Sequence, residues 1–283
     1  MISGNGFLER LVAGKWIAGP SIRDSIRRSK ELNALKITAI INYLGEEFTS
    51  EEDIEDTVIT YQKLILEIHK HKVNADISVK ASQLGLRVSS KKFVSNYSKI
   101  VSLARKNKVF VWLDMETAAD VDATVSAYKS QLKAGGHVGI CIQSYLKRSA
   151  SDIKSLSRLG AVIRLVKGAY SSDTRTAFRS RQEKTANYKM LMEYMFLHSN
   201  DFVIATHDQS MVSLAKRLHS SHHKNFQYAM LNGIRGNLAK QLAGDGWRVE
   251  VYVPFGTRWL SYSYRRLKEA SNLSLVLKSI FSS

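Results

Sequence analysis

The stretch VFVWLDMETAADVDATVSAYKSQLKAGGHVGICIQ, residues 109–143, contains the pattern that decides the fold. It begins with an apolar run at 109–114 and ends with a second apolar run at 137–142. Between them, Thr117-Ala118-Ala119-Asp120 is a typical helix start signal. Apolar residues then recur on one helical face: Val121, Val125, Tyr128 and Leu132. Two strand-like runs joined through a helix predict parallel neighbouring strands, because such a crossover returns the chain in the same direction.

The same alternation repeats along the whole chain. Strand-like runs occur at 36–43, 76–80, 109–114, 137–142, 161–166, 202–206, 226–231 and 249–253. Several are continuous and rich in β-branched residues, which is typical of parallel strands covered by helices. Pro254 is expected directly after the last strand, where it would interrupt no ladder.

Eight β–α repeats without a linker-like stretch predict an α/β fold, a closed (β/α)₈ barrel of the TIM type. We expect a single domain over residues 1–283: an extra N-terminal helical segment at 1–35 that covers one end, and the barrel itself at 36–283. The alternative is an open doubly wound sheet, but no Gly-x-Gly-x-x-Gly turn follows the first strand.

Composition limits the classes of function. The chain of 283 residues has no apolar run of about 18 residues, and its start has no signal-peptide core. The single cysteine, Cys141, excludes an internal disulfide and fits a reducing, cytoplasmic compartment. Because it lies in an apolar run, we interpret it as a core residue and not as a reactive thiol.

The net charge of +17 points to an anionic partner. The basic residues are scattered, and no zinc spacing, helix-turn-helix signature or basic–aromatic motif accompanies them, so nucleic acid is not the partner we expect. An anionic cofactor or the headgroups of an anionic membrane fit better. A basic binding module remains the alternative, and it predicts salt-sensitive binding without flavin absorbance.

Polar residues gather where the predicted strands end, which is where barrel enzymes place their chemistry. They are Lys80; Asp114-Met115-Glu116; Gln143; Arg164 with Lys167-Gly168-Ala169-Tyr170; Thr206-His207-Asp208; and Tyr252. Each has an ordinary explanation, such as a helix cap for Asp114, a structural histidine for His207 or a turn for Gly168. Their recurrence favours a site for anionic ligands. No metal is expected, because no set of residues has ligand spacing.

The helix predicted near the end of the chain adds a possible anion clamp. Tyr262, Arg265, Arg266 and Glu269 share one face, and paired guanidiniums bind carboxylates well. The alternative is an exposed helix with an ordinary Arg–Glu pair.

The segment Val162–Tyr170 resembles the "RLVKGAY" signature of flavin-dependent proline dehydrogenases. Further segments resemble the same family in the same order: 78–80, 84–86, 113–116, 143–148, 205–208, 230–235, 252–256 and 262–269. The resemblance implies a distorted barrel whose last helix lies over the mouth. It also implies a monofunctional enzyme, because the chain has no room for the further domains of multifunctional relatives.

What the resemblance implies for function is specific. The reaction would be FAD-dependent oxidation of L-proline to Δ1-pyrroline-5-carboxylate, the first step of proline catabolism, with hydride passing from C5 to flavin N5. Electrons would go on to a quinone. Separately from the resemblance, the excess positive charge favours peripheral docking at the inner face of an anionic membrane.

The resemblance assigns a role to individual residues. The polar groups nearest the reaction would be Asp114 and Arg164. The substrate would be bound by Lys80, Tyr170, Leu231, Tyr252, Tyr262, Arg265 and Arg266. FAD would be bound by Met115, Gln143, Arg164, Lys167, Gly168, Ala169, Thr206 and His207. A hydroxyproline dehydrogenase, to be distinguished at Tyr262, and an inactive barrel remain as alternatives.

Overall fold

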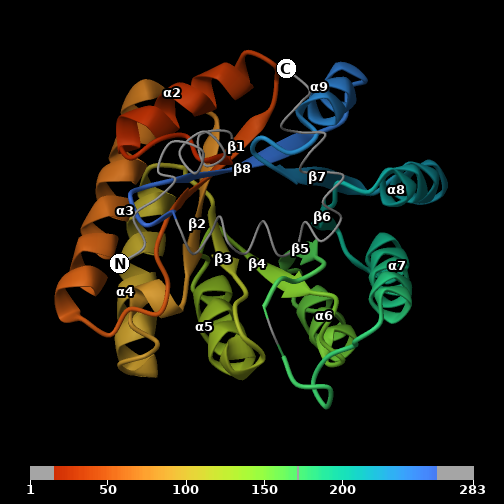
Figure 1. Ribbon diagram of the computed structural model, residues 1–283, viewed down its shortest axis with the longest axis horizontal. Coiled ribbons are helices and arrows are strands. Elements are labelled where there is room, and N and C mark those ends of the chain that lie inside the picture. Colours follow the sequence, from red (N-terminus) through yellow and green to blue (C-terminus); the bar gives the residue numbers. More distant parts are fainter. Residues whose placement is uncertain (1–15, 171, 260–283) are drawn as a thin grey trace, which may run out of the picture.

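The structure is a computed structural model, and it describes residues 16–170 and 172–259. Eight parallel strands close into a barrel in sequence order, with β8 pairing back to β1, and helices surround it (Figure 1). The strands are β1 (Thr38–Tyr43), β2 (Ala75–Lys80), β3 (Val111–Asp114), β4 (Val138–Gln143), β5 (Val162–Val166), β6 (Asp201–Ala205), β7 (Asn225–Leu231) and β8 (Val249–Phe255). The predicted (β/α)₈ barrel is therefore confirmed.

In the described part of the chain, α2 precedes β1, and one helix follows each strand from β1 to β7. They are α2 (Ile22–Asn33), α3 (Glu51–His71), α4 (Ser90–Lys106), α5 (Val121–Lys133), α6 (Ser149–Ser157), α7 (Arg181–His198), α8 (Gln209–His222) and α9 (Gly236–Gly244), with short 3₁₀ turns η1 (Ser82–Leu84) and η2 (Ala118–Asp120). The start signal at residues 117–120 is confirmed: Thr117 and Asp120 form a reciprocal capping box around η2, directly before α5.

Strand residues alternate between two cores. Outward side chains such as Ile77 and Leu113 pack with the helices in the main hydrophobic core. Inward side chains fill the barrel, where Ile40, Trp112 and Val203 form a separate cluster. The large indole fits because β4 contributes Gly139 beside it: a Cβ there would lie 2.5 Å from the Trp112 ring. The barrel is thus packed through its middle, which leaves its ends for polar side chains.

The N-terminal segment takes a different course from the one expected. Trp16 and Ile17 pack against Leu44, just after β1, so this part does reach the C-terminal end of the strands. The expectation is wrong for α2, which lies along the side of the barrel against β1 and β8, next to α3 (Figure 1). The reason is its apolar face, since Ile26 and Leu32 join the core between strands and helices.

The position of Pro254 also differs from the prediction. It lies inside β8, level with Asn42 of β1. On the other side of β8, the pairing with β7 ends at Tyr252, and the carbonyl of Pro254 accepts a hydrogen bond from Ala18 N at 2.9 Å. A proline is tolerated here because the β7 ladder no longer needs an N–H at this level.

Candidate active site

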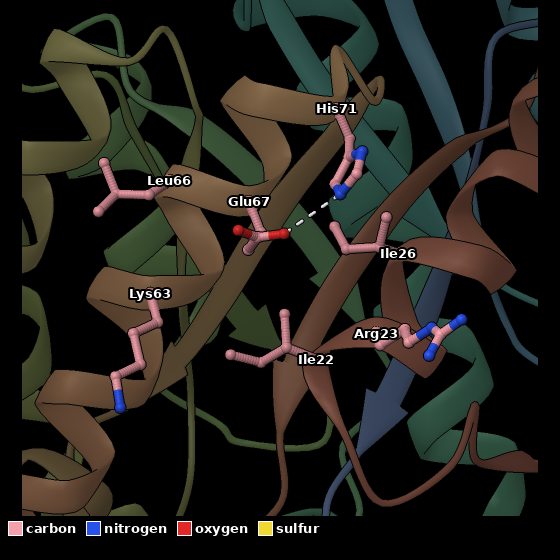
Figure 2. Close-up of a pocket in the computed structure, with 7 residues that line it drawn as sticks. All are labelled: Ile22, Arg23, Ile26, Lys63, Leu66, Glu67 and His71. Atoms are coloured by element: carbon pink, nitrogen blue, oxygen red, sulfur yellow. Dashed lines mark ion pairs between the residues drawn. The ribbon is translucent and has the colours of Figure 1, made fainter.

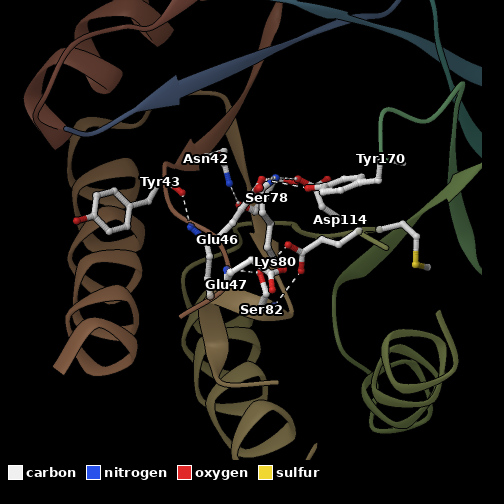
Figure 3. A network of polar contacts seen from close by, with 12 residues as sticks. Asn42, Tyr43, Glu46, Glu47, Ser78, Lys80, Ser82, Asp114 and Tyr170 are labelled. Atoms are coloured by element: carbon white, nitrogen blue, oxygen red, sulfur yellow. Dashed lines mark hydrogen bonds and ion pairs between the residues drawn. The ribbon is translucent and has the colours of Figure 1, made fainter. Parts of the chain in front are cut away.

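Asp114, the last residue of β3, is the centre of a buried polar cluster at the C-terminal end of the barrel. Its carboxylate accepts hydrogen bonds from Arg164 Nη2 at 2.6 Å, Tyr252 OH at 2.8 Å and Lys80 Nζ at 3.4 Å. These three side chains come from β5, β8 and β2, and closure of the barrel brings them together (Figure 3 shows the Lys80 side). The structure thus joins four of the predicted site residues directly.

The charges of this cluster compensate one another. Burial by itself would raise the pKa of Asp114, but Lys80 and Arg164 outweigh it and lower the pKa to about 2. Burial likewise works against the charge of Lys80, yet nearby oxygen groups, from Tyr252 and Tyr170 to Asp114, raise its pKa well above the ordinary value. Asp114 is therefore an anion and Lys80 a cation throughout the physiological range.

Arg164 is held on several sides and is 3 % exposed. Its Nε donates to Cys141 Sγ at 2.9 Å, and Nη2 also donates to Ser78 Oγ at 3.1 Å. Its guanidinium lies 4.6 Å from the centre of the Trp112 ring, a favourable cation–π arrangement. Nη1 is buried and has no hydrogen-bond partner among the described residues. A buried donor of this kind normally requires a partner, so it is suited to meet a ligand.

Glu46, in the loop after β1, belongs to the same cluster but was missed from the sequence. Its Oε1 lies 3.5 Å from Lys80 Nζ and accepts a hydrogen bond from Tyr170 OH at 3.0 Å (Figure 3). The sequence does carry a signal for Glu46. Polar residues occur at the end of the first strand as at the others, namely Asn42 and then Glu46.

The predicted cofactor residues lie at the ends of β3 to β6. Gln143 donates from Nε2 to the Met115 carbonyl at 3.0 Å, while its Oε1 is buried without a partner among the described residues. Gly168 has φ +98°, and a Cβ there would lie 2.0 Å from the Tyr145 ring. Only glycine lets the loop after β5 approach the ring this closely.

The remaining predicted cofactor and wall residues are at the same end of the barrel. Lys167 Nζ lies 3.7 Å from Asp208 Oδ2 and is half exposed. Thr206 Oγ1 accepts a hydrogen bond from Asp208 N at 3.1 Å. His207 Nε2 accepts a hydrogen bond from the backbone N of Leu231 at 2.9 Å, which joins the ends of β6 and β7.

Three predicted substrate residues cannot be placed in this way. Tyr262, Arg265 and Arg266, together with the closing helix, lie outside the described residues. Their assignment remains a prediction.

A pocket of about 480 Å³ lies elsewhere, on the outer surface between α2 and α3 (Figure 2). It contains the ion pair of Glu67 with His71 at 3.2 Å, and its Leu66 is 50 % exposed. Its charged side chains are solvated, in contrast with the buried, mutually bonded charges around Asp114. We therefore assign the chemistry to the barrel end.

The described residues provide neither a metal site nor a membrane-spanning helix. No group of three or more His, Cys, Asp or Glu side chains in residues 16–170 and 172–259 is arranged to hold a metal ion. Within the same ranges, no helix combines the length and the apolar character needed to span a membrane.

Comparison with known proteins decides the family. The model of the proline dehydrogenase family matches residues 25–278. Proline dehydrogenase 1 of Bacillus subtilis (strain 168) is 34 % identical over 275 residues, which cover 96 % of this chain and 91 % of that protein. The proline dehydrogenase of Deinococcus radiodurans is 33 % identical over 266 residues, with 91 % and 86 % covered. The chain belongs to the proline dehydrogenase family.

Solved structures support the fold of this proline dehydrogenase family member. Proline utilization A (PutA) from Bdellovibrio bacteriovorus, inactivated by N-propargylglycine, superposes with a TM-score of 0.86 at 23 % identity. The match covers 96 % of this chain but 34 % of that one, so this chain spans about a third of the larger protein. The resemblance noted from the sequence is thus confirmed. The protein is an enzyme of a flavin-dependent family that oxidises proline.

Proposed function

We propose that the protein oxidises L-proline to Δ1-pyrroline-5-carboxylate. FAD, when bound, supplies the redox chemistry by accepting the hydride from proline C5 at flavin N5. The observation that carries the proposal is the buried cluster of Asp114, Arg164, Lys80 and Tyr252 in a chain that the proline dehydrogenase family model matches at residues 25–278.

The residues at the barrel end fit such a cofactor. Two buried polar atoms, Arg164 Nη1 and Gln143 Oε1, have no partner among the described residues and would be satisfied by hydrogen bonds to a heterocyclic ring. Gly168 brings backbone close to the site without a side chain. The residues that would hold FAD are Met115, Gln143, Arg164, Lys167, Gly168, Ala169, Thr206 and His207.

Lys80 is the described residue best suited to bind the substrate carboxylate. It is a buried ammonium with a raised pKa, and its contacts to Asp114 and Glu46, at 3.4 and 3.5 Å, are long for charged hydrogen bonds. We propose that Arg265 and Arg266 complete this anion site. The wall around the pyrrolidine ring would be formed by Tyr170, Leu231, Tyr252 and Tyr262.

The chain's own residues then act through orientation and charge. Proline must react as the neutral amine, because positive charge develops on C5 and nitrogen as hydride leaves. With its pKa near 2, Asp114 is a weak base, so its role is to stabilise that developing charge and to orient Arg164. Arg164 is a fixed cation, and it favours the negative charge that arrives on the cofactor ring. Neither group has to reorganise during the reaction.

We further propose that electrons pass to a membrane quinone and that the protein docks peripherally at the cytoplasmic face of an anionic membrane. Support comes from the net charge of +17, since basic residues near anionic lipid contribute about 1 kcal/mol each. Pelleting with liposomes tests this: binding should increase with the anionic lipid fraction. Equal pelleting with neutral and anionic liposomes would contradict it.

The activity itself is tested by a visible spectrum of the purified protein before and after anaerobic addition of L-proline. We expect a flavin spectrum that loses its visible band when proline is added. D-proline is the control, because it presents the same groups in the mirror arrangement. Purified protein without flavin, or flavin that L-proline leaves oxidised, would refute the proposal.

A further inference from the structure

Cys141 lies at the centre of the barrel end, on β4, directly level with Arg164 on β5. Its side chain is 3 % exposed and points to the inside, among the polar residues. Its sulfur accepts a hydrogen bond from Arg164 Nε at 2.9 Å and lies 3.2 Å from Asp114 Oδ1. The thiol is therefore buried in the core, as the sequence predicted, and its sulfur also contacts the polar side chains of Arg164 and Asp114.

The three side chains close a ring of contacts. Two donors of one guanidinium, Nε and Nη2, meet Cys141 Sγ and Asp114 Oδ1, and those two acceptors contact each other. A planar guanidinium held by two adjacent donors has a defined orientation. This orientation leaves Nη1 as the donor without a partner among the described residues. Asp114 and Ser78 both contact Nη2, so Cys141 is the residue that holds the Nε side of the guanidinium.

The thiol can make both contacts only in its protonated form. Burial raises the pKa of Cys141 strongly, and the neighbouring Asp114 raises it further, against the opposing effect of Arg164. The neutral S–H can donate to Asp114 while the sulfur accepts from Arg164. An apolar side chain would leave the Arg164 Nε–H buried and unpaired, which costs free energy.

We propose that Cys141 is a positioning residue that fixes the plane of the Arg164 guanidinium, so that Nη1 is presented to the cofactor. This inference rests on the proposed function, because it concerns Arg164 acting on a bound flavin.

The test compares Cys141→Val, which removes both hydrogen bonds, with Cys141→Ser, which retains a donor and an acceptor. Ile142→Val is the matched control, because Ile142 is a buried neighbour on β4 that belongs to the core between strands and helices. The flavin midpoint potential is measured by reductive titration without proline. Steady-state kcat and KM for proline and the thermal midpoint are measured on the same samples.

We expect Cys141→Val to shift the potential to more negative values and to lower kcat about tenfold with little change in KM, as for one lost buried hydrogen bond. Cys141→Ser should stay within about threefold of the parent in kcat and keep its potential. Ile142→Val should lower only the thermal midpoint. If Cys141→Val does not fold, Cys141→Ala takes its place with the same expectation.

A parent-like potential and kcat in the apolar variant would overturn the inference. So would an equal loss in the serine variant, because serine retains both hydrogen bonds. Failure of the proposed function has a different signature: the parent protein itself would then carry no flavin or would not be reduced by proline.

Discussion

The pKa of Asp114 and the pKa values of Asp76 and Glu250, all buried in the same barrel, are shifted in opposite directions. At the C-terminal end, the pKa of Asp114 is lowered to about 2 because the cations of Lys80 and Arg164 outweigh its burial. Nearer the N-terminal end, burial raises the pKa of Asp76 on β2 to about 7 and that of Glu250 on β8 to about 8, the latter with help from the charge of Asp76. All three carboxyl groups are buried, and the direct contacts of Asp114 with Lys80 and Arg164 distinguish it from the other two.

Trp112 lies between these two regions and contacts both. Its Nε1 donates to Asp76 Oδ2 at 3.3 Å, while its ring stacks with Arg164 at 4.6 Å. Arg164 makes its direct ion pair with Asp114, and Oε2 of Glu250 is buried without a hydrogen-bond partner among the described residues. Near neutral pH, burial therefore favours the protonated forms of Asp76 and Glu250, which form the floor of the barrel at its N-terminal end. Arg164 therefore forms its ion pair at the C-terminal end of the barrel, the mouth, where the proposed reaction takes place.

Among the substitutions that test this difference in pKa, Asp114→Asn should have the largest effect. It leaves Arg164 buried without its ion-pair partner and Lys80 with Glu46 alone, so we expect a loss of about 3–5 kcal/mol in unfolding free energy and at least about a hundredfold in kcat. Urea unfolding and steady-state rates measure both.

Asp76→Asn, the same exchange on the floor, is the control and should retain activity. The stability difference between Asp114→Asn and the parent should shrink by about 2–3 kcal/mol between about pH 4 and pH 2, where the native carboxylate takes up its proton. Equal activity losses in the two variants would contradict the distinction between mouth and floor.

Glu250→Gln tests the raised pKa at the N-terminal end of the barrel. Because the native pKa of Glu250 is about 8 and its ordinary value 4.5, the native state holds a proton that the unfolded chain releases between these pH values. The parent therefore loses stability from this group as pH rises from about 4.5 to 8, and the amide removes that loss. We expect the variant to be more stable than the parent by several kcal/mol at pH 8.5 and similar to the parent at pH 4. Denaturant unfolding across this range measures it; a variant less stable than the parent at pH 8.5 would contradict the proposed cause.

Trp112→Phe should have the smallest effect. Phenylalanine keeps a ring beside Arg164 but removes the donor to Asp76, so we expect a loss of about 1 kcal/mol that is larger at pH 8 than at pH 5, since an ionised Asp76 needs the donor more. Unfolding at both pH values gives the difference, and kcat should stay within about twofold. A large fall in kcat without this pH dependence would show that the Trp112 indole acts mainly on Arg164 in the active site and not on Asp76.

The sequence predicted the strands well because each is a short apolar run between helical segments. All eight predicted runs lie within two residues of the observed strand bounds. The mouth residues were also predictable, since parallel strands bring their ends together. The polar floor left a signal that was not used: Asp76 and Glu250 are charged residues at inward positions of otherwise apolar strands.

Other features could not be read in this way. The contact of Cys141 with Arg164 depends on the register between β4 and β5, which sequence spacing does not fix. The pKa values depend in the same way on distances between strands that are remote along the chain. Asp114 and Tyr252 illustrate this, since their hydrogen bond joins β3 to β8.

The missing side chain at Gly139 constrains how this barrel can evolve. Any larger residue there would collide with the indole of Trp112, so it can be accepted only after the indole has been replaced. Replacing the indole removes the donor to Asp76, and a non-aromatic replacement also removes the ring beside Arg164. Substitutions at Gly139 and Trp112 are therefore coupled in order: a larger residue on β4 is accepted only after a change on β3.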